Sequence, residues 1–113
     1  MQILSNYALN SWLPHAGKGD PQLNAITGEI IATAGSEGLD FAAMMHYART
    51  VGNPALRKMN FYERGLMLKK LAIYLHDRRK TYYPLSYATG ATKADSWVDI
   101  EGGIGTLFAY ASL

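Results

Sequence analysis

The side chains of this sequence that could carry chemistry are few and widely spaced. Asp99 and Glu101 lie two positions apart, which on a helix directs them to different sides, so they form a poor general acid–base pair. His15, His46 and His76 are scattered and have no second ligand at zinc spacing. Cysteine is absent from the 113 residues, which excludes a thiolate nucleophile. The residues therefore predict no catalytic, cofactor-binding or metal-binding position in this chain.

Basic and aromatic residues gather in one stretch of the sequence. Lysines and arginines at positions 69–70 and 78–80 lie near Tyr82, Tyr83 and Tyr87, which could combine a phosphate contact with a stacking platform. The alternative, which we favour, is a solvated helix face with amphipathic tyrosines. With 11 basic and 9 acidic residues, the net charge of +2 is too small to indicate a nucleic-acid partner.

Three glycines interrupt the final predicted helix. Gly102, Gly103 and Gly105 each cost about 1 kcal/mol relative to alanine inside a helix, which a chain tolerates where something passes close to the backbone. They do not follow a strand, so they are not a dinucleotide-binding turn. Five positions follow helical spacing and could share a face: Val98, Gly102, Gly105, Thr106 and Ala109. Alternatively, the glycines only allow close helix packing, or the helix begins later in the chain.

The elements that must position these residues begin with extended structure up to about Thr33. Thr27 and Gly28 are flanked by apolar residues at 25–26 and 30–31 and predict a tight hairpin turn, with glycine supplying a positive φ angle. A glycine-bearing loop is expected through positions 17–21. Because an isolated hairpin is marginal in water, these strands need a surface to lie on.

Helical patterns follow. The first is predicted from about Leu39 to Thr50, ending at 52–54, where a glycine is followed by asparagine and proline. On its apolar face, His46 is predicted to be a partly buried packing residue. The second helix begins at Asn60, with Glu63 completing a capping box. Its apolar stripe comprises Phe61, Gly65, Leu68, Ala72 and Leu75.

Two further helices complete the expected fold. One begins at about Asp77, is bent or ended by Pro84 and is closed by Gly90, and the last opens at Thr92 with Asp95. The predicted class is α+β: an N-terminal hairpin of two or three strands in residues 1–35, then three or four helices in residues 36–113. The length leaves room for one domain at most.

Composition indicates that part of the surface is covered by more protein. Hydrophobic residues make up 49% of the chain and charged residues only 18%, with eight tyrosines and five methionines. Leu113 follows no helix-stop signal, so we expect a truncated chain. No signal peptide or membrane-spanning run is visible, which predicts a soluble, cytoplasmic protein without a membrane partner.

Residues 91–113 resemble the N-terminal region of the aldehyde dehydrogenase superfamily. The resemblance is narrower still to the ring-cleavage semialdehyde dehydrogenases of aerobic phenylacetate and benzoate degradation, which act on coenzyme A thioesters. Residues 26–31, 36–40 and 54–64 match the same family. The resemblance extends from about Tyr7 to Leu113, and its segment from Trp97 onward is the most specific.

This resemblance implies that the chain is part of a cofactor-binding domain whose other partner is the remainder of the dehydrogenase. The intact enzyme is expected to use NAD or NADP and to be a homo-oligomer, with a cysteine nucleophile outside this segment. The segment alone would bind no cofactor and catalyse nothing. The final helix passes beside the substrate tunnel in this family, which makes its five small-residue positions tunnel-lining candidates.

Two alternatives stay open. The chain could be a complete small helical protein whose tyrosine- and methionine-rich surface binds a protein partner. A weaker alternative is a basic helical nucleic-acid binder.

Overall fold

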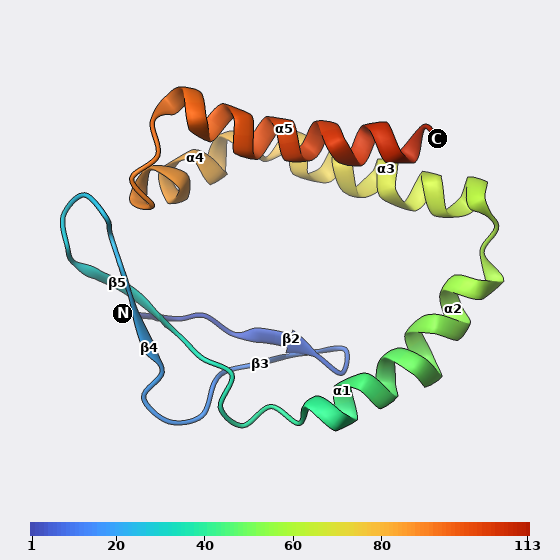
Figure 1. Cartoon of the computed structure of the whole chain (residues 1–113), viewed down its shortest axis with the longest axis horizontal. Helices are drawn as coiled ribbons and strands as arrows, with labels where there is room; N and C mark the ends of the chain where they lie inside the picture. Colours follow the sequence, from blue (N-terminus) through green and yellow to red (C-terminus); the bar gives the residue numbers. More distant parts are fainter. The chain divides into compact units, whose positions relative to one another are not determined.

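The computed structural model describes residues 1–113, which form two compact units, residues 1–55 and residues 56–113. All strands precede all helices, which confirms the predicted α+β class (Figure 1). The prediction of one hairpin of two or three strands is wrong, because five short strands form two sheets. The last strand ends at Ala34 and the first helix begins at Phe41. No helix has both the length and the apolar character needed to cross a lipid bilayer.

The first unit contains two small sheets. In the larger one, β5 (Ile30–Ala34) lies between β1 (Gln2–Ile3), which is parallel to it, and β4 (Asp20–Leu23), which is antiparallel. The other sheet is the hairpin of β2 (Asn6–Ala8) and β3 (Ser11–Leu13). Leu9 and Asn10 both have positive φ angles, as the tightest hairpin turns require.

The predicted turn at Thr27 and Gly28 is present, and Gly28 has a φ angle of +75°. Ile26, however, lies in the turn rather than in a strand. The reason is Asn24, whose side-chain oxygen accepts hydrogen bonds from the backbone of Ile26 and Thr27 and so lengthens the loop. Pro21 lies in β4 rather than in the expected loop. An edge strand tolerates proline because one of its sides needs no ladder hydrogen bond.

The first helical segment is continuous where the sequence predicted a stop. Helix α1 (Phe41–Tyr47) is capped by Asp40, whose side chain accepts a hydrogen bond from the backbone of Ala43. The chain then widens into a π-helical segment, η1 (Ala48–Gly52), and continues as α2 (Asn53–Lys58). The predicted end at 52–54 is therefore wrong. Pro54 follows directly after the π-type bond from Asn53 to Ala48, so the proline lies at a local widening of a continuous helical segment.

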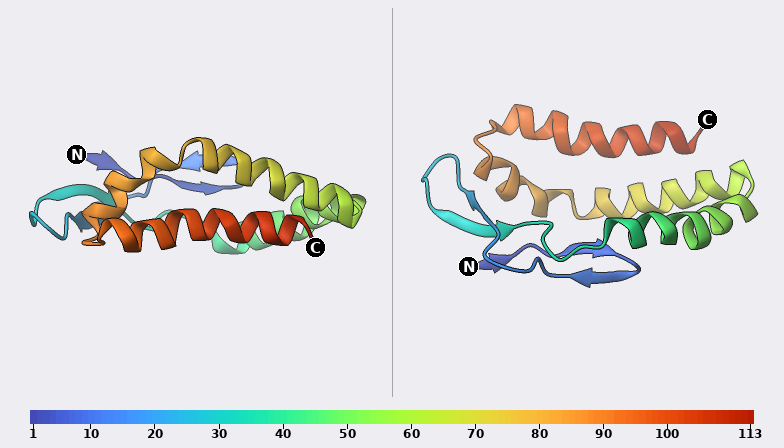
Figure 2. Two further views of the ribbon diagram at one scale, coloured as in Figure 1. Left: turned by 90° about the horizontal axis from the view of Figure 1, so that it is seen from above. Right: turned by 60° about the horizontal axis from the view of Figure 1, so that its bottom comes forward.

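Three helices make up most of the second unit, which begins within α2. They are α3 (Phe61–Asp77), α4 (Arg79–Ala88) and α5 (Lys93–Ala111), and α5 packs along both α3 and α4. Helices α3 and α5 run antiparallel and side by side (Figures 1 and 2). The buried residues of this unit are Ala72, Ser86, Ser96 and Ile104, so small side chains make up most of the buried contact between the helices.

The start of α3 is as predicted. Asn60 and Glu63 form a reciprocal capping box, with both hydrogen bonds 2.8 Å long. Ala72 is buried, and Gly65, Leu68 and Leu75 are half-buried, which confirms most of the apolar stripe. Phe61 is the exception, because it is 88% exposed. Helix α5 ends at Ala111, beside Gly65, one turn short of Phe61.

The start of α4 is close to the predicted one at about Asp77: the break falls at Arg78, with φ −104° and ψ 4°. Pro84 was predicted to bend or end the helix, and it does not end it, because it lies inside α4. Pro84 removes the donor to the carbonyl of Lys80, but Lys80 is exposed and water can replace that bond. Gly90 closes the segment with a φ angle of +89°, as predicted. Thr92 caps α5 by accepting a hydrogen bond from the backbone of Asp95.

Candidate functional site

The five small-residue positions of α5 are all exposed in the second unit. They are Val98, Gly102, Gly105, Thr106 and Ala109. A Cβ atom added at Gly102, Gly103 or Gly105 would meet no atom within 4 Å. These glycines therefore serve no close packing within this unit. The helix also begins at Lys93, well before them, so a late helix start is excluded.

The helical glycine that does allow close packing is Gly65 of α3. A Cβ atom there would lie 2.8 Å from the carbonyl oxygen of Ala111. Gly65 was identified only as one position of an apolar stripe. Its glycine identity, among larger apolar residues of that stripe, was the available signal for a close helix crossing.

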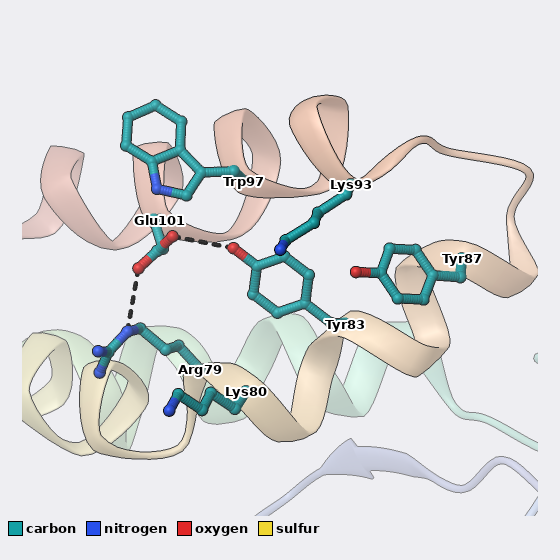
Figure 3. Close-up of a pocket in the computed structure, with 7 residues that line it drawn as sticks. All are labelled: Arg79, Lys80, Tyr83, Tyr87, Lys93, Trp97 and Glu101. Carbon is teal, nitrogen blue, oxygen red and sulfur yellow. Dashed lines mark hydrogen bonds and ion pairs between the residues drawn. The ribbon is translucent and has the colours of Figure 1, made fainter.

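The other candidate lies between α4 and α5, where Glu101 is held by two partners (Figure 3). Its Oε1 lies 3.0 Å from Nε of Arg79, and its Oε2 accepts a hydrogen bond of 2.9 Å from the Tyr83 hydroxyl. The Arg79 and Glu101 side chains are 31% and 25% exposed. Asp99, two positions before Glu101, is exposed, so the two carboxylates face different sides as predicted.

The environment of Tyr83 favours its neutral form. Desolvation of the phenol raises its pKa above the ordinary value of about 10, and the hydrogen bond to Glu101 and the negative charge of that carboxylate raise it further. The positive charge of Arg79 lowers it. Tyr83 is therefore a hydrogen-bond donor to Glu101 at neutral pH and not a general base.

A cavity of about 450 Å³ opens beside Arg79, Tyr83 and Glu101. Figure 3 shows the residues that line it: Arg79, Lys80, Tyr83, Tyr87, Lys93, Trp97 and Glu101. The first four come from α4 and the others from one side of α5, where Lys93, Trp97 and Glu101 recur at every fourth position. That spacing was visible in the sequence, but the two helices could not be paired from it.

The predicted basic and aromatic cluster is divided by the structure. Arg79 and Tyr83 are half-buried and contact Glu101, so these two do not belong to the fully solvated face that we favoured. Arg78 turns away instead, and its guanidinium lies 3.5 Å from the centre of the Tyr74 ring. The residues that remain exposed, as expected of a solvated face, are Lys69, Lys70 and Lys80.

The prediction that His46 is partly buried is wrong. His46 is exposed, because the main contact of α1 is the π-helical segment that follows it. His15, which received no role, is buried, and its Nε2 lies 3.0 Å from Oγ1 of Thr33. Gly19 and Gly35 make room for its ring, and these glycines were the signal that could have identified it. No three histidine, aspartate or glutamate side chains lie close enough together to hold a metal ion.

Comparison with known proteins supplies the class: over nearly its whole length, the chain is similar to a semialdehyde dehydrogenase. The relative is the 3,4-dehydroadipyl-CoA semialdehyde dehydrogenase of Aromatoleum evansii, which is 35% identical over 109 residues, or 96% of this chain. Those residues are 21% of the relative, so the chain spans about a fifth of its length. No family model matches the chain. The resemblance predicted from the sequence is confirmed.

Proposed function

We propose that this chain is part of an NAD(P)-dependent aldehyde dehydrogenase that oxidises a coenzyme A-linked semialdehyde during the breakdown of activated aromatic rings. The observation that carries this proposal is the 35% identity over 96% of the chain to a 3,4-dehydroadipyl-CoA semialdehyde dehydrogenase. The same resemblance extends the proposal to a cytoplasmic homo-oligomer. When bound, the cofactor accepts hydride from the substrate.

In this proposal the segment does not perform the chemistry itself. It contains no cysteine, so the nucleophile must come from another part of the enzyme. Its own contribution is to support the cofactor-binding domain and to form one wall of the passage by which the substrate reaches the nucleophile.

The α5 face supports the second role. Val98, Gly102, Gly105, Thr106 and Ala109 are exposed, and the glycines leave open space where side chains would otherwise project. A wall of small residues leaves width for a bulky acyl group. Substitution by a large side chain would narrow the passage without disturbing the contact of α5 with α3 and α4.

The uncovered apolar surface of α3 supports the first role. Five large apolar side chains of α3 are between 41% and 53% exposed: Leu66, Met67, Leu71, Ile73 and Tyr74. An apolar surface of this extent usually marks contact with more protein. We assign that contact to the remainder of the dehydrogenase. A stand-alone partner-binding module would use the same surface, but it would unfold cooperatively as a monomer.

The tunnel assignment is tested by Gly102→Leu in a chimera, in which this chain replaces the matching segment of the Aromatoleum evansii relative. We expect kcat/KM for a coenzyme A-linked semialdehyde to fall by about tenfold or more, and that for a short free aldehyde to change far less. Gly103→Leu is the matched control, because Gly103 is equally open but does not belong to the five positions. Equal losses on both substrates, or from both variants, would reject the tunnel role.

A further inference from the structure

We propose that the cavity between α4 and α5 binds a nucleotide, that is, a planar heteroaromatic ring carrying phosphate. The proposed dehydrogenase function does not require this site, and the proposal of a nucleotide site does not depend on the dehydrogenase function. The cavity of about 450 Å³ lies within the size range of small-molecule sites.

The charges that line the cavity favour an anion. Its one carboxylate, Glu101, is already neutralised by Arg79 and holds a hydrogen bond from Tyr83. Lys80 and Lys93 line the same cavity and form no ion pair. The charges of Arg79 and Glu101 cancel, so the two unpaired ammonium groups leave an excess positive charge at the cavity. Lysine acts as a point-charge ligand for phosphate.

The aromatic side chains favour a planar ring next to that phosphate. Tyr83 and Tyr87 lie with their ring centres 5.9 Å apart and tilted by 59°, so they are not stacked face to face. Trp97 is 57% exposed at the same cavity. An exposed aromatic ring such as that of Trp97 can stack on a nucleobase, and the half-buried rings of Tyr83 and Tyr87 lie at the same cavity.

The arrangement of the two helices fixes which lysine matters most. Lys93 and Trp97 lie one turn apart on α5, on the same side as Glu101. In Figure 3 the ammonium group of Lys93 is directed toward the ring of Tyr83, whereas Lys80 extends past Arg79 at the other side. We therefore assign the phosphate contact mainly to Lys93, with Lys80 at the rim.

The site is tested by tryptophan fluorescence on the 113-residue chain carrying Trp12→Phe, which leaves Trp97 as the single tryptophan. Adenosine 5′-monophosphate is expected to quench Trp97 saturably, and adenosine or inorganic phosphate alone to bind at least about tenfold more weakly. Lys93→Gln is expected to weaken the affinity for adenosine 5′-monophosphate about fivefold or more. Lys70→Gln, on an exposed part of α3 outside the cavity, is expected to have no effect.

Lys93 and Lys70 are both exposed, so substituting either one removes a charge without opening the contact between helices. Circular dichroism checks that the helix content of each variant is unchanged. Coenzyme A and NADP are titrated in parallel with adenosine 5′-monophosphate. If coenzyme A binds more tightly than the other two ligands, the nucleotide belongs to a thioester substrate. If all three ligands bind equally, the site takes a free nucleotide. Absence of saturable quenching would overturn the proposal. Equal effects of Lys93→Gln and Lys70→Gln, or preferential binding of a single-stranded oligonucleotide, would also overturn it.

Discussion

The side chains of Ser86 and Ser96 form a buried hydrogen bond of 2.8 Å between α4 and α5. Ser96 is fully buried and Ser86 is 8% exposed. The two helices therefore meet through a pair of hydroxyl groups rather than through large apolar side chains. Small residues at this point allow the helices to approach closely enough for Arg79 and Tyr83 to reach Glu101.

Removing one hydroxyl of this pair should cost more than removing both. Ser96→Ala leaves the Ser86 hydroxyl buried without a partner, which costs about 1–3 kcal/mol of unfolding free energy. The double variant Ser86→Ala/Ser96→Ala leaves no such group and should be more stable than Ser96→Ala. Urea unfolding of Ser86→Ala, Ser96→Ala and the double variant measures this, and strictly additive losses would contradict it.

Alanine should have opposite effects at two glycines of the helical unit. Gly65→Ala places a Cβ atom 2.8 Å from the carbonyl oxygen of Ala111 and should destabilise the chain by about 1–3 kcal/mol. Gly102→Ala meets no atom and should stabilise it by up to about 1 kcal/mol. Thermal unfolding of both variants decides the matter. A stabilising Gly65→Ala would show that α5 does not pack on α3 as described.

Tyr83 should make stability fall at high pH. Its pKa is raised in the folded chain, so the stability it contributes is complete below the unfolded pKa of about 10 and is lost as the pH rises through the folded pKa. The parent chain should therefore lose stability relative to Tyr83→Phe between about pH 9 and pH 11. Urea midpoints at both pH values measure the difference. A constant difference would argue against the contact with Glu101.

The capping box should contribute measurably to α3. Asn60→Ala removes the acceptor for the backbone of Glu63 and should cost about 1 kcal/mol. Glu63→Ala should also destabilise, whereas Glu63→Gln retains a side chain that can accept the reciprocal bond. Chemical denaturation compares the variants. Similar losses from Glu63→Gln and Glu63→Ala would mean that charge at the helix start, rather than capping, is responsible.

Local signals in the sequence predicted the parts of the fold that depend on neighbouring residues. The capping box at Asn60, the positive φ angles of Gly28 and Gly90, and the start of α5 at Thr92 each involve hydrogen bonds or dihedral angles within a few positions. Proline and glycine were less reliable as stop signals. A π-helical segment precedes Pro54, and Pro84 lies inside α4, because an exposed carbonyl that loses its partner can bond to water.

The candidate cavity could not be predicted because it depends on which helix faces pair. Lys93, Trp97 and Glu101 recur every fourth residue, but nothing local specifies that they face Arg79 and Tyr83. Burial of His15 rather than His46 was missed for the same reason, since His15 fits between glycines separated from it by up to twenty positions. Long-range pairing is determined by the whole packed structure, not by periodicity.

The most direct test of the dehydrogenase assignment is turnover by the chimera that carries this chain in place of the matching segment of the Aromatoleum evansii enzyme. We predict reduction of NAD or NADP, followed by absorbance, with a coenzyme A-linked semialdehyde as substrate, and none from the enzyme lacking that segment. A chimera with the circular dichroism spectrum and oligomeric state of the parent enzyme, but without turnover, would contradict the proposed function.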